Sequence, residues 1–348
     1  MKDRTIQPNK IRDLTPKRMA TWPVYQLFGL RMASDFPFAT PLIQEDGEVD
    51  LVFTCVNQSP LGESWTQEAP VYHRRLGEEE NEAEIALYHF DELDVLRLTA
   101  AADFYLWPDR IYCQAHKPNA AYLIEIGILG IVFALWLEER GSPALHASAC
   151  VVEEKAVAFL SSNQGGKSTL TAAMMQAGMP LLTDDLLPVE RTEGAFFGRP
   201  GYPAMRMWPE QVKHFVGNDK GFETVHPLFD KRRVPVGIDG FGTFHATPQA
   251  LGCIYVPERR DPHRFGIEIA FNPIPPGEAV IELVRHSFVA SIVQALNDHS
   301  TRLSFFSSLL QQAPLRRVIY PEGFEHLPLV REAILEDLAH LQIPSEGS

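Results

Sequence analysis

The stretch Lys155–Val189 limits what this chain can fold into more than any other part of the sequence. It opens with a short apolar run, KAVAFL, and continues into a polar loop with two glycines, SSNQGGKST. A segment with helical spacing follows, and a second apolar run, LLTDDLLPV, carries paired acids. This order predicts a strand, a loop, a helix and a second strand, which is the setting in which a glycine-bearing loop binds phosphate.

The loop has the residue types that phosphate binding requires. Gly165 and Gly166 lack a Cβ atom, so successive N–H groups can turn inward around an anion. Lys167 can reach the β- and γ-phosphates of a nucleotide, and the Ser168 hydroxyl can bind Mg²⁺. The pattern G-x-x-x-x-G-K-[ST] is incomplete, because Ser161 occupies the first glycine position. An ordinary strand-to-helix turn with a surface lysine is the alternative, and the flanking elements favour nucleotide binding.

The segment after the loop has the spacing of a short helix. Apolar residues recur at i, i+3, i+4 and i+7 from Leu170 to Ala177, and Gly178 follows where a helix would end. We therefore expect a helix of about ten residues that begins near Lys167 and packs on a sheet.

The paired acids Asp184 and Asp185 stand at the end of the next predicted strand. An acid at this point can hold Mg²⁺ directly or through water, and a second acid can accept a proton from an attacking hydroxyl. Because neighbouring residues of a strand point to opposite faces, the two acids should have different roles. A solvated turn is the alternative for an Asp-Asp pair, but its position soon after the GKS triplet favours a site.

Composition narrows the class of protein. The chain has 348 residues, of which 45% are hydrophobic, which is enough for a full core in two domains or in one large domain with an added layer. Its net charge of −14 argues against binding to nucleic acid or to an anionic membrane surface. The four cysteines are far apart, which fits free thiols in a reducing compartment. The N-terminal segment lacks the apolar stretch of a signal peptide, so we expect a cytoplasmic protein.

The sequence divides into a tail, two domains and a second tail. Residues 1–20 read as a mobile tail, 21–118 as a strand-rich domain, 119–342 as an α/β domain and 343–348 as a tail. The most hydrophobic segment, Ala120–Leu137, approaches the length of a membrane span, but Glu125 interrupts it. A core helix is the preferred interpretation, and a membrane anchor the alternative.

A histidine precedes the loop in an apolar run. His146 lies within Ala144–Val152, which we expect to be a strand that leads directly towards the phosphate loop. A histidine in a core strand is usually only a hydrogen-bonded core residue. Its place before the loop allows a second role, in which it holds Asp185 in position.

These motifs together resemble a known family. HASA at His146, GGKST and LLTDDLLPV are similar to the C-terminal domain of HPr kinase/phosphorylase. The resemblance is closest to the HPr-kinase-like proteins of peptide-modification clusters, including lasso-peptide precursor kinases. RPGYPAMRMWP at Arg199–Pro209, KRRVPV at Lys231–Val236 and VYQLFGLRMASDFPF at Val24–Phe38 agree with that subgroup. It implies an α/β P-loop kinase core, related to that of phosphoenolpyruvate carboxykinase, behind a strand-rich N-terminal domain.

The resemblance also implies roles for single residues and the cofactors ATP and Mg²⁺. The ATP phosphates would lie against Ser161, Ser162, Asn163, Gln164, Gly165, Gly166, Lys167, Ser168 and Thr169. Ser168 and Asp184 would bind the metal, while Asp185 would be the catalytic base, with His146 as its support and Lys167 beside the transferred phosphate. Arg206, Lys231 and Arg232 are available to neutralise phosphate charge.

The departures from the family bear on the substrate. Ser161, Asn163 and Gln164 replace three letters of the usual G-x-S-G-x-G-K-S loop, and Gly237 replaces an arginine after the IPV-like motif. These changes argue against phosphorolysis and against HPr as the acceptor. We expect a kinase that phosphorylates a serine of a peptide, such as a lasso-type precursor, or of a small protein. A carboxykinase-like enzyme acting on a small acid and a non-catalytic nucleotide-binding peptide scaffold are the alternatives, and a homo-oligomer remains open.

Overall fold

The computed structural model describes residues 21–62, 64–75, 83–162, 165–218, 221–227, 229–296 and 299–342. The two predicted tails, 1–20 and 343–348, and the loop residues Asn163 and Gln164 lie outside the described residues.

The chain groups into two compact units. The first consists of the described residues of Met1–Arg140 and Ser291–Asp298, and the second of those of Gly141–Ala290 and His299–Ser348. The division thus falls at Arg140/Gly141, whereas the sequence placed a domain boundary at 118/119. The apolar segment that follows residue 118 belongs with the first unit.

The first unit is built on a nine-stranded sheet, in agreement with the strand-rich region expected from the sequence. The strand order is β3-β1-β2-β4-β9-β8-β7-β6-β5, and β4 runs parallel to both β2 and β9 while the other pairs are antiparallel. The strands are β1 (Val24–Leu27), β2 (Leu30–Ser34), β3 (Ile43–Gln44), β4 (Leu51–Cys55), β5 (Tyr72–Arg75), β6 (Glu84–His89), β7 (Asp94–Leu98), β8 (Ala102–Leu106) and β9 (Arg110–Ala115), with a 3₁₀ turn, η3 (Ser64–Gln67).

The apolar segment forms a broken helix in this unit. It consists of α1 (Ala121–Gly127), a π-helical turn, η4 (Ile128–Val132), and α2 (Phe133–Glu138), and the backbone leaves the helical region at Gly130. The buried Glu125 carboxylate accepts hydrogen bonds from the N–H groups of Ala39 (2.8 Å) and Thr40 (2.9 Å), which satisfies it inside the core. Ala121–Glu138 is long and apolar enough to cross a membrane, but 67% of it is buried, as in the core helix of a globular protein.

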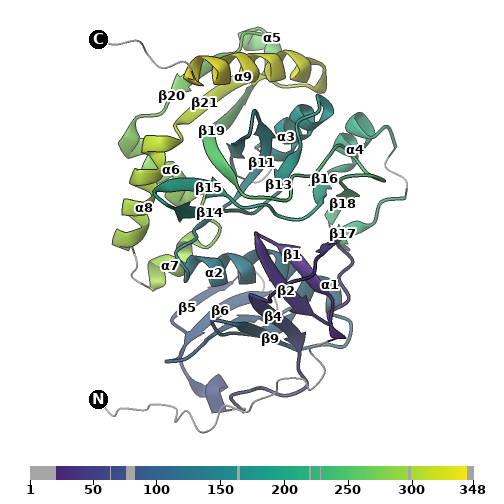
Figure 1. Ribbon diagram of the computed structural model, residues 1–348, viewed down its shortest axis with the longest axis vertical. Coiled ribbons are helices and arrows are strands. Elements are labelled where there is room, and N and C mark those ends of the chain that lie inside the picture. Colours follow the sequence, from purple (N-terminus) through teal and green to yellow (C-terminus); the bar gives the residue numbers. More distant parts are fainter. Residues whose placement is uncertain are drawn as a thin grey trace. The chain divides into compact units, whose positions relative to one another are not determined.

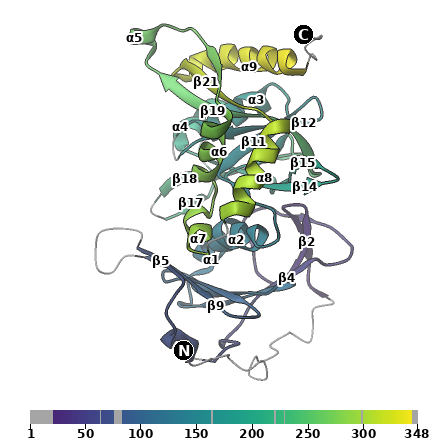
Figure 2. The same ribbon diagram turned by 90° about the vertical axis from the view of Figure 1, so that its left-hand side faces the viewer.

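The second unit is a mixed sheet with helices on both faces (Figures 1 and 2). The strand order is β10-β14-β15-β19-β12-β11-β13, with β21 beside β19 and β20 beside β21. The strands are β10 (Ala144–Leu145), β11 (Ala147–Val152), β12 (Lys155–Leu160), β13 (Leu181–Thr183), β14 (Leu187–Thr192), β15 (Ala195–Gly198), β19 (Gln249–Arg260), β20 (Ala270–Pro273) and β21 (Leu315–Pro321). A smaller sheet of order β16-β18-β17 contains β16 (Ala204–Met207), β17 (Thr224–His226) and β18 (Phe229–Pro235).

The remaining elements are helical. They are α3 (Lys167–Gln176), α4 (Pro209–Phe215), α5 (Pro262–Phe265), α6 (Pro276–Arg285), α7 (Ala290–Ala295), α8 (His299–Gln312), η5 (Phe324–His326) and α9 (Leu327–Gln342). Helix α3 begins at Lys167 and is ten residues long, as the sequence predicted.

Alternate residues of β12 face the two cores. Val157 and Phe159 pack with residues of α3, α4 and α9, whereas Ala156, Ala158 and Leu160 pack with residues of α6 and α8. Burial on both faces explains why this strand reads as a continuous apolar run in the sequence. The second unit is therefore an α/β layered structure, as expected.

Candidate functional site

The glycine-bearing loop connects the end of β12 to the start of α3. Gly166 precedes α3 with a φ of +97°, and a Cβ atom there would come within 2.6 Å of the Tyr320 hydroxyl oxygen. A Cβ atom at Gly165 would come within 2.4 Å of Ser161 Oγ. Any larger residue would thus clash at either position, and the positive φ of Gly166 also favours glycine there. The loop turns tightly into the positive end of a helix, which is an arrangement that binds anions.

Lys167 is buried beneath the loop. Its ammonium group donates hydrogen bonds to the carbonyl oxygens of Ser161 (2.9 Å) and Ser162 (3.2 Å). Burial lowers the pKa of Lys167, although the charges of Asp185 and Asp184 oppose that change. Its ammonium group therefore contacts neutral carbonyl oxygens directly, and an anion in the loop would compete with them for it.

The turn after β13 contacts the first turn of α3 through Asp184 and Ser168. The Ser168 hydroxyl donates to Asp184 Oδ1 at 2.9 Å, and the backbone N–H of Arg206 donates to Asp184 Oδ2 at 2.9 Å. Burial, followed by the charge of Asp185, raises the pKa of Asp184. The oxygen pair of Ser168 and Asp184 fits a Mg²⁺ ion that takes its other ligands from phosphate and water. No group of three or more His, Cys, Asp or Glu side chains suited to a metal occurs within the part of the chain that the structure describes.

The paired acids lie in a tight turn after the strand. Their side chains therefore point in different directions because of this turn, and not because of the alternation of a strand, as was expected from the sequence. Strand β13 ends at Thr183, and Asp185 has a φ of +66°, which is rare for a residue with a side chain. The N–H of Leu186 donates to the carbonyl oxygen of Asp184 (2.9 Å), and the Thr183 hydroxyl donates to that of Leu186 (2.6 Å). The hydrogen bond that spans Asp185 makes a γ-turn with positive φ, a strained form that clusters at functional sites.

Asp185 lies beside Arg206 and His146. Arg206 Nη1 lies 3.5 Å from Asp185 Oδ2, and His146 Nε2 lies 3.9 Å from Asp185 Oδ1. Burial opposes ionisation of Asp185, but the nearby charges, led by those of Arg206 and Lys231, lower its pKa overall. Burial likewise opposes the charge of Arg206, while Tyr202 and the two acids raise the pKa of Arg206. Asp185 is therefore ionised and accessible as a hydrogen-bond acceptor.

His146 lies at a break in the expected strand. The run Ala144–Val152 forms two short strands, β10 and β11, and His146 stands between them. Its backbone N–H donates to the carbonyl oxygen of His286 at 2.7 Å. Burial, followed by the charge of Lys167, lowers the pKa of His146 to about 4, so the ring is neutral at pH 7. The 3.9 Å separation from Asp185 is a close approach and not a direct hydrogen bond.

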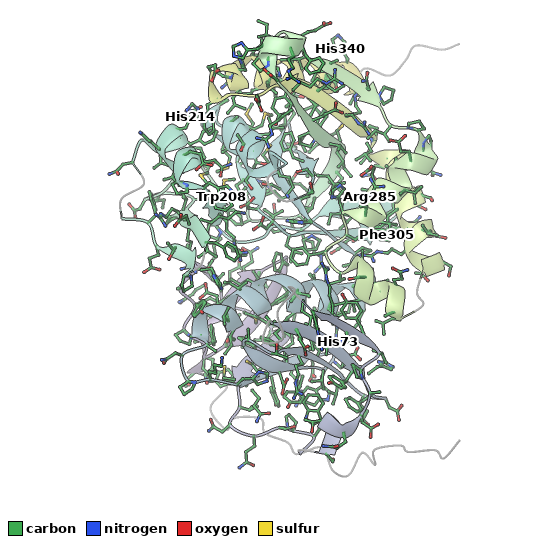
Figure 3. All side chains as sticks on the ribbon, turned by 180° about the vertical axis from the view of Figure 1, so that it is seen from behind. His73, Trp208, His214, Arg285, Phe305 and His340 are labelled. Carbon is green, nitrogen blue, oxygen red and sulfur yellow. The ribbon has the colours of Figure 1, made fainter. Side chains whose placement is uncertain are left out.

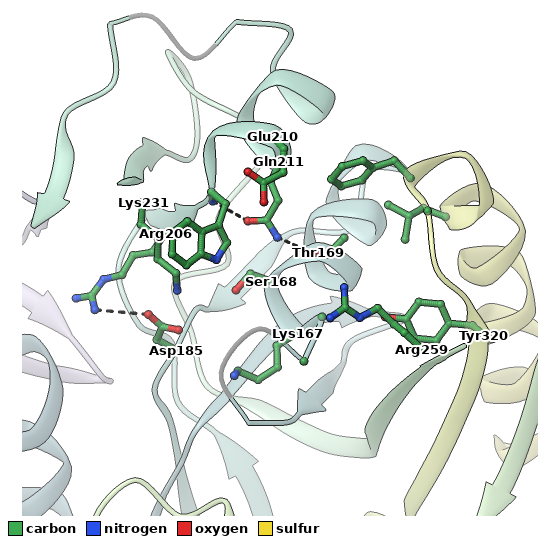
Figure 4. Close-up of a pocket in the computed structure, with 16 residues that line it drawn as sticks. Lys167, Ser168, Thr169, Asp185, Arg206, Glu210, Gln211, Lys231, Arg259 and Tyr320 are labelled. Atoms are coloured by element: carbon green, nitrogen blue, oxygen red, sulfur yellow. Dashed lines mark hydrogen bonds and ion pairs between the residues drawn. The ribbon is translucent and has the colours of Figure 1, made fainter. Parts of the chain in front are cut away.

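A cavity of about 480 Å³ opens over the loop (Figure 4). The described residues that line it are Gly165, Gly166, Lys167, Ser168, Thr169, Asp185, Arg206, Trp208, Glu210, Gln211, Lys231, Arg259, Tyr320, Gly323, Phe324 and Leu327. This set includes Lys231, whose Nζ lies 5.7 Å from the centre of the Trp208 ring, but not Arg232. Because neighbours on β18 alternate in direction, Lys231 and Arg232 face opposite ways.

The structure brings most of the expected site residues together. Six of them line the cavity, namely Lys167, Ser168, Thr169, Asp185, Arg206 and Lys231. Asp184 contacts Ser168, and His146 lies close to Asp185. The Gln211 side chain, which the sequence did not single out, accepts from the N–H of Trp208 (2.8 Å) and donates to Thr169 Oγ1 (2.6 Å). It therefore ties α4 to α3 beside the loop.

The other residues that the sequence missed come from distant strands. β12, β19 and β21 run parallel, so their carboxyl ends meet at the same edge of the sheet as the loop. Arg259 lies at the end of β19 and Tyr320 at the end of β21, and both line the cavity there. No local sequence pattern marks these two positions, because the strand pairing that brings them to the loop is non-local.

Comparisons with known proteins add little to this geometry. No protein-family model matches the chain, and no curated protein matches its sequence. Among solved structures, the HPr(Ser) kinase/phosphatase from Coxiella burnetii is similar over 57% of this chain and 97% of that chain. The two are 13% identical with a TM-score of 0.29, an overlap that supports no conclusion about this chain.

Proposed function

We propose that this protein is an ATP-dependent kinase that transfers a γ-phosphate to the hydroxyl group of a serine in a peptide or small protein. The observation that carries the proposal is the arrangement of one cavity. Gly165, Gly166, Lys167 and Ser168 line it, Asp184 is hydrogen-bonded to Ser168, and an ionised carboxylate, Asp185, lines it as well. Phosphoryl transfer needs positioning and charge neutralisation more than covalent chemistry, and these residues supply both.

The loop would bind the phosphates. Its N–H groups and the start of α3 favour an anion, and Lys167 would exchange the carbonyl oxygens of Ser161 and Ser162 for phosphate oxygens. Ser168 and Asp184 would hold Mg²⁺, which neutralises charge on the β- and γ-phosphates when bound.

The acceptor would approach from the side of Asp185. The serine oxygen attacks the γ-phosphorus, the bond from that phosphorus to the β–γ bridging oxygen breaks, and ADP leaves. Asp185 accepts the proton of the serine hydroxyl, because its lowered pKa keeps it ionised. Arg206 and Lys231 offset charge on the transferred group, while the neutral His146 ring limits where the Asp185 carboxylate can turn.

The acceptor class rests on the motifs shared with HPr-kinase-like peptide kinases. The test is incubation with Mg²⁺-ATP, a serine-containing precursor peptide and the same peptide with that serine replaced by alanine. We expect one phosphate on the serine peptide and none on the alanine peptide, read by mass spectrometry. Labelling of a small acid alone would favour the carboxykinase-like alternative, and ATP binding without any transfer would favour the scaffold.

A further inference from the structure

The cavity has two ends of different chemistry. On one side of the loop lie the charged or polar groups of Asp185, Arg206 and Lys231. On the other side lie Arg259 of β19 and Tyr320 of β21, and the lining residues Gly323, Phe324 and Leu327 follow Tyr320 closely in the chain. Figure 4 shows Arg259 and Tyr320 on the opposite side of Lys167 from Asp185 and Arg206. These five residues are apolar apart from the guanidinium of Arg259 and the hydroxyl of Tyr320, and Glu210 and Gln211 of α4 also line the cavity.

The proposed reaction fixes the direction in which a nucleotide lies. The γ-phosphate must meet Asp185, and the preceding phosphates must follow the loop past Lys167. The nucleoside then leaves the loop on the far side from Asp185. We propose, on the basis of the proposed function, that the base and ribose of the nucleotide bind against Phe324 and Leu327, with Arg259 at the junction between nucleoside and phosphates.

Phe324 is held ready for an aromatic ligand. Its ring stacks on His214 with centroids 4.5 Å apart and planes 15° apart, and it meets Phe215 edge-on at 6.1 Å. Trp208 and His214 lie near the two ends of α4 (Figure 3), so the helix that flanks the phosphate loop also braces Phe324. A ring fixed in this way loses little freedom when a flat base packs on it.

Tyr320 lies beside the phosphate loop. Its hydroxyl oxygen lies against Gly166 of the loop and has no hydrogen-bond partner among the described residues, although it is buried. An unpaired buried hydroxyl is unfavourable unless a partner arrives. A phosphate oxygen bound beside Gly166 would offer this hydroxyl an acceptor.

The test compares Mg²⁺-ATP with Mg²⁺-tripolyphosphate, which has the phosphates but no nucleoside. Dissociation constants are measured by calorimetry for the unmodified protein, Phe324→Ala and Phe324→Leu. Phe271→Ala is the matched control, because Phe271 is a half-buried member of the same core but is not among the described residues that line the cavity. We expect Phe324→Ala to weaken ATP binding about tenfold or more and to leave tripolyphosphate binding within about twofold.

The outcomes separate this proposal from the function on which it rests. If the unmodified protein binds neither ligand, both the phosphate loop and the nucleoside end are wrong. If it binds both, and Phe324→Ala and Phe324→Leu either have no effect or weaken both ligands equally, the nucleoside end is wrong while the loop stands. A selective loss of ATP binding in Trp208→Ala instead would place the base at the Asp185 end. Phe324→Leu keeps an apolar side chain, so its result holds even if Phe324→Ala fails to fold.

Discussion

Ser168 Oγ and Asp184 Oδ1 are joined by a 2.9 Å hydrogen bond that links the first turn of α3 to the turn after β13. This contact places a hydroxyl and a carboxylate oxygen side by side at the phosphate loop. The two side chains come from the two halves of the strand–loop–helix–strand unit, so the geometry of the proposed metal site depends on that unit being intact.

Asp184→Asn should therefore raise the Mg²⁺ concentration needed for half-maximal activity by about tenfold or more, because an amide binds Mg²⁺ less well than a carboxylate. Ser168→Ala should act in the same direction. Ser308→Ala is the control, because Ser308 is a half-buried serine of α8 that donates to the Ser304 carbonyl oxygen and is not among the described residues that line the cavity. The measurement is a Mg²⁺ titration of ATP turnover, and an unchanged Mg²⁺ requirement in both site variants would exclude this pair as metal ligands.

Gly166→Ala should weaken nucleotide binding and destabilise the fold. The added methyl group would meet the Tyr320 hydroxyl at 2.6 Å, and the φ of +97° is unfavourable for alanine. The backbone conformation alone should lower the free energy of unfolding by about 1–2 kcal/mol. In Gly166→Ala/Tyr320→Phe the clash is removed, so part of the stability should return. No recovery in urea unfolding would show that the clash contributes nothing.

Tyr320→Phe alone should keep or slightly raise stability. The hydroxyl that it removes is buried without a partner among the described residues, so the change in unfolding free energy should be between zero and a gain of about 1 kcal/mol. Tyr255→Phe is the matched comparison in the same core, because Tyr255 donates to Asp337 Oδ2 at 2.7 Å. That variant should lose about 1–3 kcal/mol. Equal losses in the two variants would mean that the Tyr320 hydroxyl is satisfied.

The first unit should lose stability in acid through Asp103. Arg97 donates to this buried carboxylate at 2.7 and 2.9 Å and His116 lies 3.1 Å from it, and although burial opposes ionisation, these partners lower the pKa of Asp103. A lowered pKa stabilises the folded state above the unfolded value, and that contribution is lost as the pH falls below about 4.

His116 acts in the opposite direction. The Asp103 contact raises the pKa of His116, so its contribution is complete in mild acid and is lost as the pH rises above about 6.5. In Asp103→Asn, the unfolding temperature should therefore vary less with pH, both in acid and above about pH 6.5, when it is measured from pH 3 to pH 9. A pH dependence equal to that of the unmodified protein would assign it to other groups.

The sequence predicted the elements that carry strong local patterns. The apolar run of β12, the glycine pair and the ten-residue helix after Lys167 are local signals, because each depends on neighbouring residues only. The positive φ of Asp185 has no such signal, since an Asp-Asp pair fits a strand end and a turn equally well. Arg259 and Tyr320 reach the loop only because three parallel strands end together, and that pairing is non-local.

The same limit applies to basic residues. Arg206, Lys231 and Arg232 looked equivalent in the sequence, and the pleat of β18 separates the last two. The side of a strand that faces a cavity depends on register with its neighbours, here β16, and register is set by packing across the sheet. The sequence alone therefore predicts a group of basic residues near the phosphate loop, but not which of them line the cavity.

The most direct measurement is the rate of phosphate transfer from ATP to a serine peptide by Asp185→Asn. Asparagine tolerates the positive φ of this turn, so the substitution removes the proton acceptor and leaves the loop in place. We predict unchanged Mg²⁺-ATP affinity and a loss of transfer of about 10²–10⁴-fold. Transfer at the rate of the unmodified protein, with ATP bound equally well, would contradict the assignment of Asp185 as the catalytic base.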